Sequence, residues 1–247
     1  MNKVQEIKMQ LLEKFGITDD ARTIGFCREA YKFLTEDNEQ EAKNEQVLSA
    51  GVAPVAVDLG LPSGTLWCDR NVGATSPEDD GAFFSWGNIE PHYPKHTEND
   101  WGDDEGVFET DVFNFDTYDE SEGAQIDGDI DAAHDAATVN MGESWKMPTE
   151  KQFVELYEHC TWQRKNVNGK NGYLVTSKKN GNSIFFSCSG YGSGSSWYGR
   201  GSNGNSWSST FRSARYARSL SFGSGGVDPQ DYDSRYYGFA LRPVQRT

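Results

Sequence analysis

The sequence predicts an α+β protein in which mixed short strands, long loops and one or two helices follow a short helical N-terminal region. Hydrophobic residues make up 36% of the 247 residues, and the 7 Trp, 11 Tyr and 14 Phe are enough to close a core. The 26 glycines favour a turn-rich architecture over a helical bundle. Runs of strand type begin near residue 53, after some fifty residues of helical periodicity.

Residues 1–50 are expected to be helical. Two apolar stripes at helical spacing support this, one of them formed by Val4, Ile7, Leu11 and Phe15. Two such short helices cannot bury both stripes by themselves, so we expect this region to serve in homo-oligomerisation or in docking to a virion. Residues 51–247 are then the second domain.

The first part of that domain alternates strand-like runs with glycine turns. VAVDLGLPSGTLWCDRNVGA has this texture, and GAFFSWGN predicts a buried aromatic strand. Residues 90–135 are acidic and poorly periodic, which predicts a long solvated loop. Calcium binding by its aspartates is the alternative, although the spacing of an EF-hand is missing.

The later elements carry clearer signals. In WKMPTEKQFVELYEHC, Thr149 is placed to cap a helix whose apolar face is Phe153, Leu156 and Tyr157. GYLVTSKKNGNSIFF predicts a hairpin that turns at Asn180-Gly181. RYYGFALRPV predicts a closing strand.

The charge of −15 and the pI near 4.6 argue against a nucleic-acid partner, because a polyanion would be repelled. The charge is uneven, however. From Ser187 onward the aspartates 228, 231 and 233 are outnumbered by arginines, at 200, 212, 215, 218, 235, 242 and 246.

No run is apolar enough for a membrane span or for a signal peptide. We therefore expect a soluble protein that is made in the cytoplasm and is virion-associated or displayed on a surface, with no membrane insertion.

Residue patterns of catalysis are missing from the sequence. The four cysteines have no metal-ligand spacing and are expected to be small buried residues, and none of the four histidines lies in an HExxH motif. The glycine-rich run GYGSGSSWYGRGSNG lacks the strand-then-helix context of a phosphate loop. The sequence thus predicts a protein without catalytic residues, metal or cofactor, and not an enzyme.

Several segments together resemble one family. They are VDLGLPSGTLWCDRNVGATSPEDDGAFFSWGN, DAAHDAATVNMGESWKMPTEKQF, NGNSIFFSCSGY, WSST and YGFALRPV. They are similar to the paralogous surface-protein domain of gut bacteria and phages that has a C-type lectin-like fold, and in particular to the variable proteins of diversity-generating retroelements. The resemblance covers about residues 55–245. It implies a receptor-binding or adhesin protein whose ligand is a cell-surface protein or glycan.

The resemblance also implies that a mutagenic reverse transcriptase rewrites the C-terminal segment, about residues 187–247, opposite template adenines. The genetic code allows a check. A randomised AAC or AAT codon can specify Ser, Gly, Arg, Tyr, Asp, Asn, Phe and Ala, but never Lys, Glu, Met, Gln or Trp. From Ser187 to Thr247 the chain has no Lys, Glu or Met, whereas Trp197 and Gln230 do not fit this scheme.

Apolar residues in this segment are expected to form a buried scaffold: Trp207, Leu220, Phe222, Phe239 and Leu241. Gly190, Gly204 and Gly238 are expected to hold turns. In SLSF, a strand would direct Ser219 and Ser221 outward.

The predicted ligand-binding face is rich in Tyr, Ser and Arg, as antibody paratopes are in Tyr and Ser. It comprises Trp197, Tyr198, Arg200, Asn205, Ser206, Phe211, Arg212, Ser213, Arg215, Tyr216, Arg218, Ser219, Ser221, Gln230, Asp231, Tyr232, Asp233, Ser234, Tyr236 and Tyr237.

Two other functions stay open. The C-type lectin-like fold also includes formylglycine-generating oxidases, which hold copper with a cysteine pair; here Cys160 and Cys188 are the only late cysteines and neither has a matching motif. The Arg/Tyr-rich strip is also suited to single-stranded nucleic acid, although the net charge opposes this.

Overall fold

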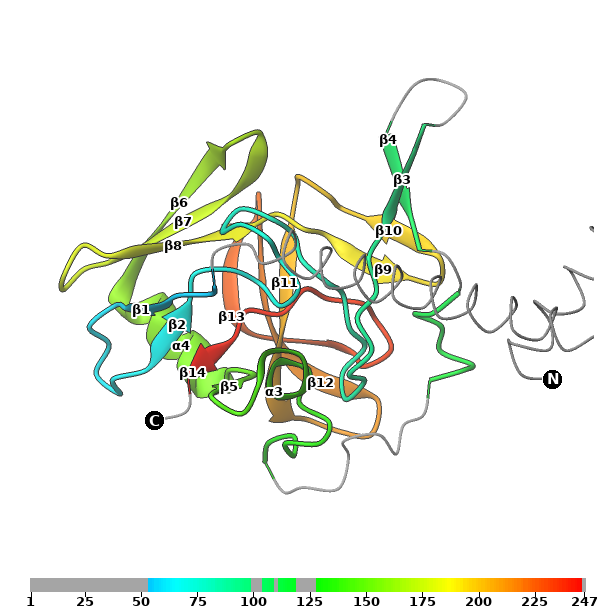
Figure 1. Cartoon of the computed structure of the whole chain (residues 1–247), viewed down its shortest axis with the longest axis horizontal. Helices are drawn as coiled ribbons and strands as arrows, with labels where there is room; N and C mark the ends of the chain where they lie inside the picture. Colours follow the sequence, from blue (N-terminus) through cyan, green and yellow to red (C-terminus); the bar gives the residue numbers. More distant parts are fainter. Residues whose placement is uncertain (1–52, 99–103, 109–110, 119–127, 246–247) are drawn as a thin grey trace, which may run out of the picture. The chain divides into compact units, whose positions relative to one another are not determined.

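The computed structural model describes residues 53–98, 104–108, 111–118 and 128–245. The chain divides into two units, Met1–Gly51 and Val52–Thr247, within one residue of the predicted boundary. The predicted helices of residues 1–50 lie outside the described residues. In the described part, fourteen short strands and two helices form an α+β domain dominated by strands (Figure 1).

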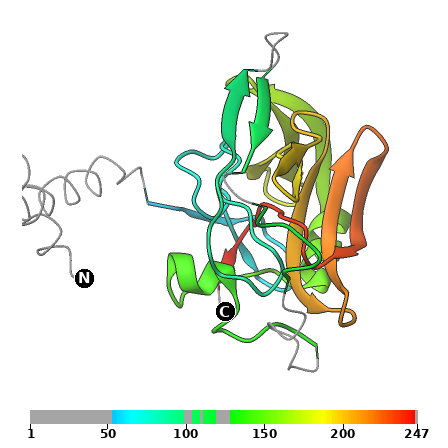
Figure 2. The ribbon, with the colours of Figure 1, turned by 90° about the vertical axis from the view of Figure 1, so that its right-hand side faces the viewer.

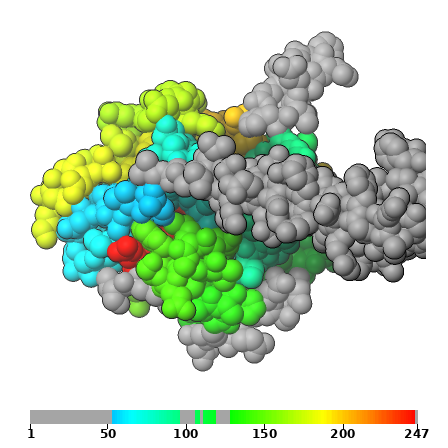
Figure 3. Space-filling view, in the orientation of Figure 1, coloured from blue at the N-terminus to red at the C-terminus, as the bar shows by residue number. Residues whose placement is uncertain are grey.

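The two ends of the domain meet in one antiparallel sheet. Its order is β1 (Ala56–Asp58), β2 (Leu66–Cys68), β14 (Val244–Gln245) and β5 (Trp145–Lys146). Because β14 lies between β2 and β5, the end of the described chain is enclosed. In Figure 3 it is seen only as a small red area between the blue and green segments.

A second sheet has the order β3 (Lys95–Glu98), β4 (Asp104–Val107), β10 (Ser196–Tyr198) and β9 (Tyr191–Ser193). It corrects the prediction of a long solvated loop over 90–135, since β3 and β4 form a hairpin inside that stretch. Phe108, Phe113 and Ile130 of the same stretch are buried. These isolated apolar side chains anchor the acidic stretch, although their spacing has no period.

The predicted helix is confirmed as α4 (Glu150–His159). The Thr149 side chain accepts from the Gln152 backbone, and Gln152 returns a bond to the Thr149 N–H, which completes a capping box. Phe153 and Leu156 are buried, but Tyr157 is 43% exposed and does not belong to the buried face. The shorter helix α3 (Ala136–Met141) is capped by Asp135.

The predicted hairpin is also confirmed. It joins β7 (Lys170–Ser177) to β8 (Ser183–Ser187), and β6 (Cys160–Val167) completes a sheet of order β6-β7-β8. Gly181 in the turn has φ 78°, in the left-handed region that glycine adopts without strain.

The fourth sheet is made by β11 (Gly204–Phe211), β12 (Tyr216–Gly223) and β13 (Gly226–Ser234). Figure 2 shows these strands, in orange, side by side along one margin of the domain. Two predicted strands are shorter than expected. GAFFSWGN is buried but forms only single bridges, such as Phe84 to Phe239, and the closing segment is a strand only at Val244–Gln245.

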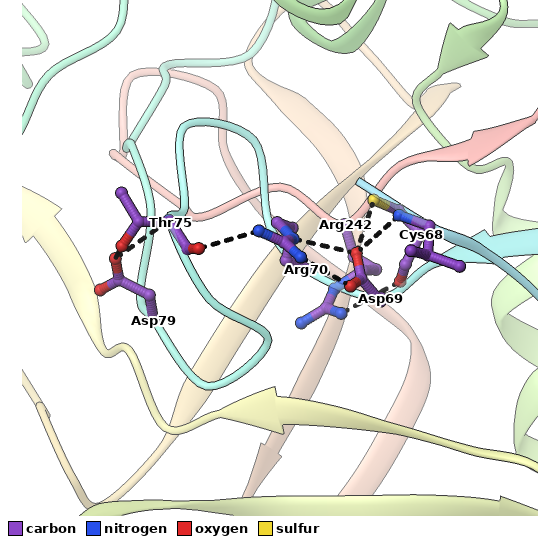
Figure 4. Close-up of polar contacts among 7 residues, drawn as sticks. Cys68, Asp69, Arg70, Thr75, Asp79 and Arg242 are labelled. Atoms are coloured by element: carbon purple, nitrogen blue, oxygen red, sulfur yellow. Dashed lines mark hydrogen bonds and ion pairs between the residues drawn. The ribbon is translucent and has the colours of Figure 1, made fainter. Parts of the chain in front are cut away.

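A buried arginine ties these parts together. Arg242 is fully buried; its guanidinium donates to Asn71 Oδ1 at 2.9 Å, to the Cys68 carbonyl at 3.1 Å and to the Phe185 carbonyl at 2.7 Å. Burial lowers its pKa to about 10, so it stays charged at neutral pH. Figure 4 shows Arg242 beside Cys68, with Arg70 bridging Asp69 and the Thr75 carbonyl nearby.

Candidate functional site: the C-terminal surface

The structure divides the predicted ligand-binding face into three groups. The exposed residues are Tyr198, Arg212, Arg215, Tyr216, Gln230 and Tyr232. The half-buried residues are Trp197, Arg200, Phe211, Ser213, Arg218, Ser221, Asp231, Asp233, Ser234, Tyr236 and Tyr237. The buried residues are Asn205, Ser206 and Ser219.

The three buried residues correct the prediction. Asn205 and Ser206 lie on β11, which is flanked on one edge by β12 and on the other by bridges such as Ser206 to Ala240. Ser206 Oγ accepts from the Arg242 backbone at 3.2 Å. Ser219 is 1% exposed and its hydroxyl donates to Asp233 Oδ2 at 2.9 Å. These polar side chains serve the interior and cannot meet a ligand without rearrangement.

The predicted scaffold residues are all buried: Trp207, Leu220, Phe222, Phe239 and Leu241. Trp207 stacks on Phe239 with ring centroids 4.2 Å apart, and its indole N–H donates to the Phe84 carbonyl. Leu220 and Phe222 pack in the cluster that contains α4. The glycine prediction holds for Gly190, whose φ of 70° lies in the left-handed region. Gly204 and Gly238 instead allow close contact with the rings of Phe222 and Phe113.

One end of the β12–β13 pair carries exposed aromatic and basic side chains. Arg218 pairs with Tyr232, and Tyr216 with Ser234, across the two strands. The rings of Tyr216 and Tyr232 meet edge to face at 5.7 Å, and the Arg212 guanidinium lies 3.1 Å from the Tyr232 centroid. Such rigid, amphipathic groups provide large contact area at low entropic cost.

Next to this pair lies a hollow of about 270 Å³. Aromatic rings dominate its wall, and the lining residues are Phe115, Tyr118, Arg215, Tyr216, Ser234 and Tyr236. Phe115 is 46% exposed, and its ring meets the Tyr236 ring edge to face. The Arg215 guanidinium lies 4.9 Å from the centroid of the Phe115 ring, in a cation–π contact. Phe115 and Tyr118 were missed from sequence because they lie in the acidic stretch, far from the C-terminal segment.

A second group on this surface, the tyrosine–aspartate corner, consists of Tyr191, Tyr198, Tyr237, Asp231 and Asp233. The Tyr191 ring stacks on Tyr198 at 5.4 Å and meets Tyr237 at 5.5 Å. Burial raises the pKa of Asp233 to about 6; the Ser219 hydrogen bond opposes this, and the charge of Asp231 adds to it. Tyr191 was not among the predicted site residues, since a single tyrosine after a glycine carries no pattern.

The same carboxylate acts on the neighbouring phenols. A hydrogen bond with Tyr236, and then burial, raise the pKa of Tyr237 to about 12, with a smaller contribution from Asp233. Burial is the main cause that raises the pKa of Tyr191, again with a contribution from Asp233. Both phenols therefore stay protonated and can donate or accept hydrogen bonds.

Trp197 has a mainly structural position. Its indole N–H donates to the Ser189 carbonyl at 2.6 Å, and its ring meets Phe83 at 5.7 Å. The half-buried Arg200, 4.9 Å from the Trp197 ring, extends this contact towards the surface.

Strand β13 is the edge strand of sheet β11-β12-β13, and three features hinder its pairing with another strand. Pro229 has no N–H to offer. The N–H of Gln230 donates to the Asp228 carboxylate at 2.9 Å, and the N–H of Tyr232 donates to the Asp231 carboxylate at 2.8 Å. Edges treated in this way resist strand addition.

The arginines of the C-terminal segment are not a continuous basic strip. Arg235 and Arg242 are buried, and Arg235 lies 4.6 Å from the Trp86 ring. Arg218 pairs with Glu150 at 3.3 Å. The positive charge read from the sequence is therefore partly internal, which weakens the basis for a nucleic-acid site.

The cysteines of the described part are Cys68, Cys160 and Cys188; all three are free and buried, as predicted for small interior residues. Burial raises the pKa of the Cys160 thiol to about 11 and also raises that of Cys188. Thiolate ligands are thus disfavoured at both positions. Over the described ranges, no three His, Cys, Asp or Glu side chains gather as a metal site would require. Neither α3 nor α4, the helices of the described residues, is long and apolar enough to cross a membrane.

Comparison of the chain with protein-family models, with curated proteins and with solved structures gave no match.

Proposed function

We propose that this protein is a ligand-binding protein of C-type lectin-like fold whose C-terminal surface is diversified by a retroelement. Its ligand is a protein or glycan of a cell surface, and the protein acts as a receptor-binding protein or adhesin. The resemblance of residues 55–245 and the missing Lys, Glu and Met after residue 186 motivate the proposal.

The observation that carries it is the separation of two roles within three strands. The side chains that hold the sheet, such as Trp207 and Leu220, are buried. The neighbouring Tyr216, Gln230 and Tyr232 are exposed. A surface of this kind can change its contact residues without changing its core, which a diversified binding protein requires.

The protected edge of β13 gives further support. A surface rewritten at random would often expose apolar side chains, and an open strand edge would then promote aggregation. With Asp228, Pro229 and Asp231 in place, this edge offers few free donors, whatever residues occupy the exposed positions 230 and 232.

Two display libraries test the proposal. One randomises the exposed positions 198, 212, 216, 230 and 232, and the matched control randomises the buried positions 205, 206 and 219. We expect most members of the first library to melt within a few degrees of the parent protein, which corresponds to a change in the free energy of unfolding of about 1 kcal/mol or less. Selection on unrelated proteins or glycans should then yield binders. Most members of the control library should unfold.

Loss of folding in both libraries alike would contradict a tolerant display surface. A folded first library from which no target selects a binder would contradict the binding function itself.

A further inference from the structure

The hollow beside the β12–β13 pair, called the aromatic hollow below, is built from two parts of the chain. Its lining residues are Phe115, Tyr118, Arg215, Tyr216, Ser234 and Tyr236. Phe115 and Tyr118 precede the segment expected to be rewritten, whereas the other four lie inside it. Two rings of the wall are therefore common to copies that differ in their C-terminal segment.

These two rings are held in place by their own contacts. The Tyr118 hydroxyl donates to the Trp86 carbonyl, and the guanidinium of the fully buried Arg235 lies 5.3 Å from the centroid of the Tyr118 ring. The Phe115 ring meets the Tyr236 ring edge to face at 5.8 Å. Because both rings are ordered before a ligand arrives, a ligand group binds with a smaller loss of side-chain freedom.

The size and charge of the hollow limit what it can bind. Its volume of about 270 Å³ equals that of about nine molecules of liquid water. That space fits one ring-bearing side chain or one sugar unit. Among the described residues that line it, Arg215 is the one charged side chain, so a ligand cation finds no counter-charge in them. A guanidinium instead attracts the electron-rich face of an aromatic ring.

The polar groups of the wall favour an aromatic side chain over a sugar. A buried sugar unit carries several hydroxyl groups, and each needs a hydrogen-bond partner because an unpaired buried hydroxyl is costly. The described lining has no carboxylate or amide side chain, and the Tyr118 hydroxyl is already bonded to Trp86. An aromatic side chain needs at most one such partner, and it gains from packing against other rings.

We propose that the aromatic hollow binds one aromatic side chain of a protein ligand, which packs against the rings of the wall and the Arg215 guanidinium. The inference rests on the proposed function and narrows it, since the ligand is then a protein with an aromatic anchor. Phe115 and Tyr118 give every copy a part of this preference, whatever residues occupy the C-terminal segment.

The experiment titrates the full chain with small probes and follows the ring resonances of Phe115 and Tyr118 by NMR. The aromatic probe is Nα-acetyl-phenylalanine methylamide. Its matched comparison is Nα-acetyl-cyclohexylalanine methylamide, which is of similar size and more apolar but has no π electrons. Methyl glycosides of glucose, galactose and N-acetylglucosamine represent a glycan ligand. We expect the aromatic probe to bind about threefold more tightly than the cyclohexyl probe, and the glycosides to leave both rings unshifted.

Three variants complete the test. Phe115→Ala should weaken binding of the aromatic probe by about tenfold, because it removes one ring of the wall. Tyr93→Ala is the matched control, at a residue that is 52% exposed and does not line the hollow, and it should bind as wild type does. Arg215→Gln keeps the test open if Phe115→Ala folds poorly, and it should remove the preference for the aromatic over the cyclohexyl probe.

Absence of saturation by the aromatic probe, equal or tighter binding of the cyclohexyl probe, saturation by a glycoside, or unchanged binding by Phe115→Ala would each overturn the inference. Such a result leaves the proposed function standing, because the two libraries accept a ligand of any chemistry and do not alter residues 115 and 118.

Discussion

The two three-stranded sheets of the domain hold their strands together in different ways. Sheet β6-β7-β8 keeps an unbroken register, and its buried side chains are mainly apolar, such as Val175 and Phe186. Sheet β11-β12-β13 has register shifts on both sides of β12 and buries serines and an asparagine among its apolar residues.

The difference teaches which positions are free to change. In the first sheet, packing of apolar side chains such as Ile184, Phe185 and Phe186 fixes the structure. In the second, hydrogen bonds of buried polar groups, such as those of Ser206 and Ser219, add to the packing of its apolar residues. A buried polar group that loses its partner costs about 1–3 kcal/mol, so the interior of the second sheet is as constrained as an apolar core.

Arg242 links the two sheets and provides the strongest test of this comparison. Its guanidinium donates to Phe185 of β8, and its backbone N–H donates to Ser206 of β11. Arg242→Ala should lower the free energy of unfolding by about 3–5 kcal/mol, because it opens a cavity and leaves buried oxygen acceptors without a hydrogen-bond donor. Urea unfolding measures this. Arg212→Ala is the exposed control, and a similar small loss in both variants would show that the link carries no stability.

Asp233 should give an intermediate, pH-dependent effect. Its folded-state pKa of about 6 lies above the 3.8 of an ordinary Asp, so the folded protein holds this proton more tightly and loses stability as pH rises from about 4 to about 6. The stability of Asp233→Asn relative to wild type should therefore rise by about 2–3 kcal/mol between pH 4 and pH 7.

Denaturation of both proteins at the two pH values gives that difference. The Asp228→Asn variant controls for the loss of a carboxylate on the same strand. A constant difference across pH would show that Asp233 titrates normally.

The smallest effects are expected at exposed positions of either sheet. Tyr216→Ala on β12 and Lys165→Ala on β6 should each change the free energy of unfolding by about 0.5 kcal/mol or less. If both variants shift the melting temperature by the same small amount, the two sheets differ only in their interiors. A large loss for Tyr216→Ala alone would make that ring part of the fold.

Local signals in the sequence were sufficient for several elements. The capping residue Thr149 and the apolar residues after it located α4, and Asn180-Gly181 located the hairpin turn. Both signals act within a few residues, so they do not depend on the rest of the fold. The five apolar scaffold residues were predicted for a similar reason, since large apolar side chains are rarely left in water.

The burial of Ser219 could not be predicted from alternation. Alternation assigns side chains to two faces, and it predicts exposure only where one face meets water. On β12 both faces are covered: Leu220 and Phe222 join the cluster of α4, while Ser219 turns to Asp233. Partners that are distant in the sequence also decide the burial of Arg235 and Arg242. Such partners bring Phe115 and Tyr191 to the C-terminal surface. No pattern within the segment reports such partners.

The pairing of β14 with β2 has a consequence for the synthesis of the protein on the ribosome. Val244 pairs with Trp67, and Arg242 reaches Asn71 and Cys68, so the first strands of the domain are completed by residues that are translated about 170 residues after them. A frameshift or premature stop upstream of Arg242 would remove these contacts. Such truncated copies are expected to fold poorly, whereas copies that differ only in exposed residues keep the contacts.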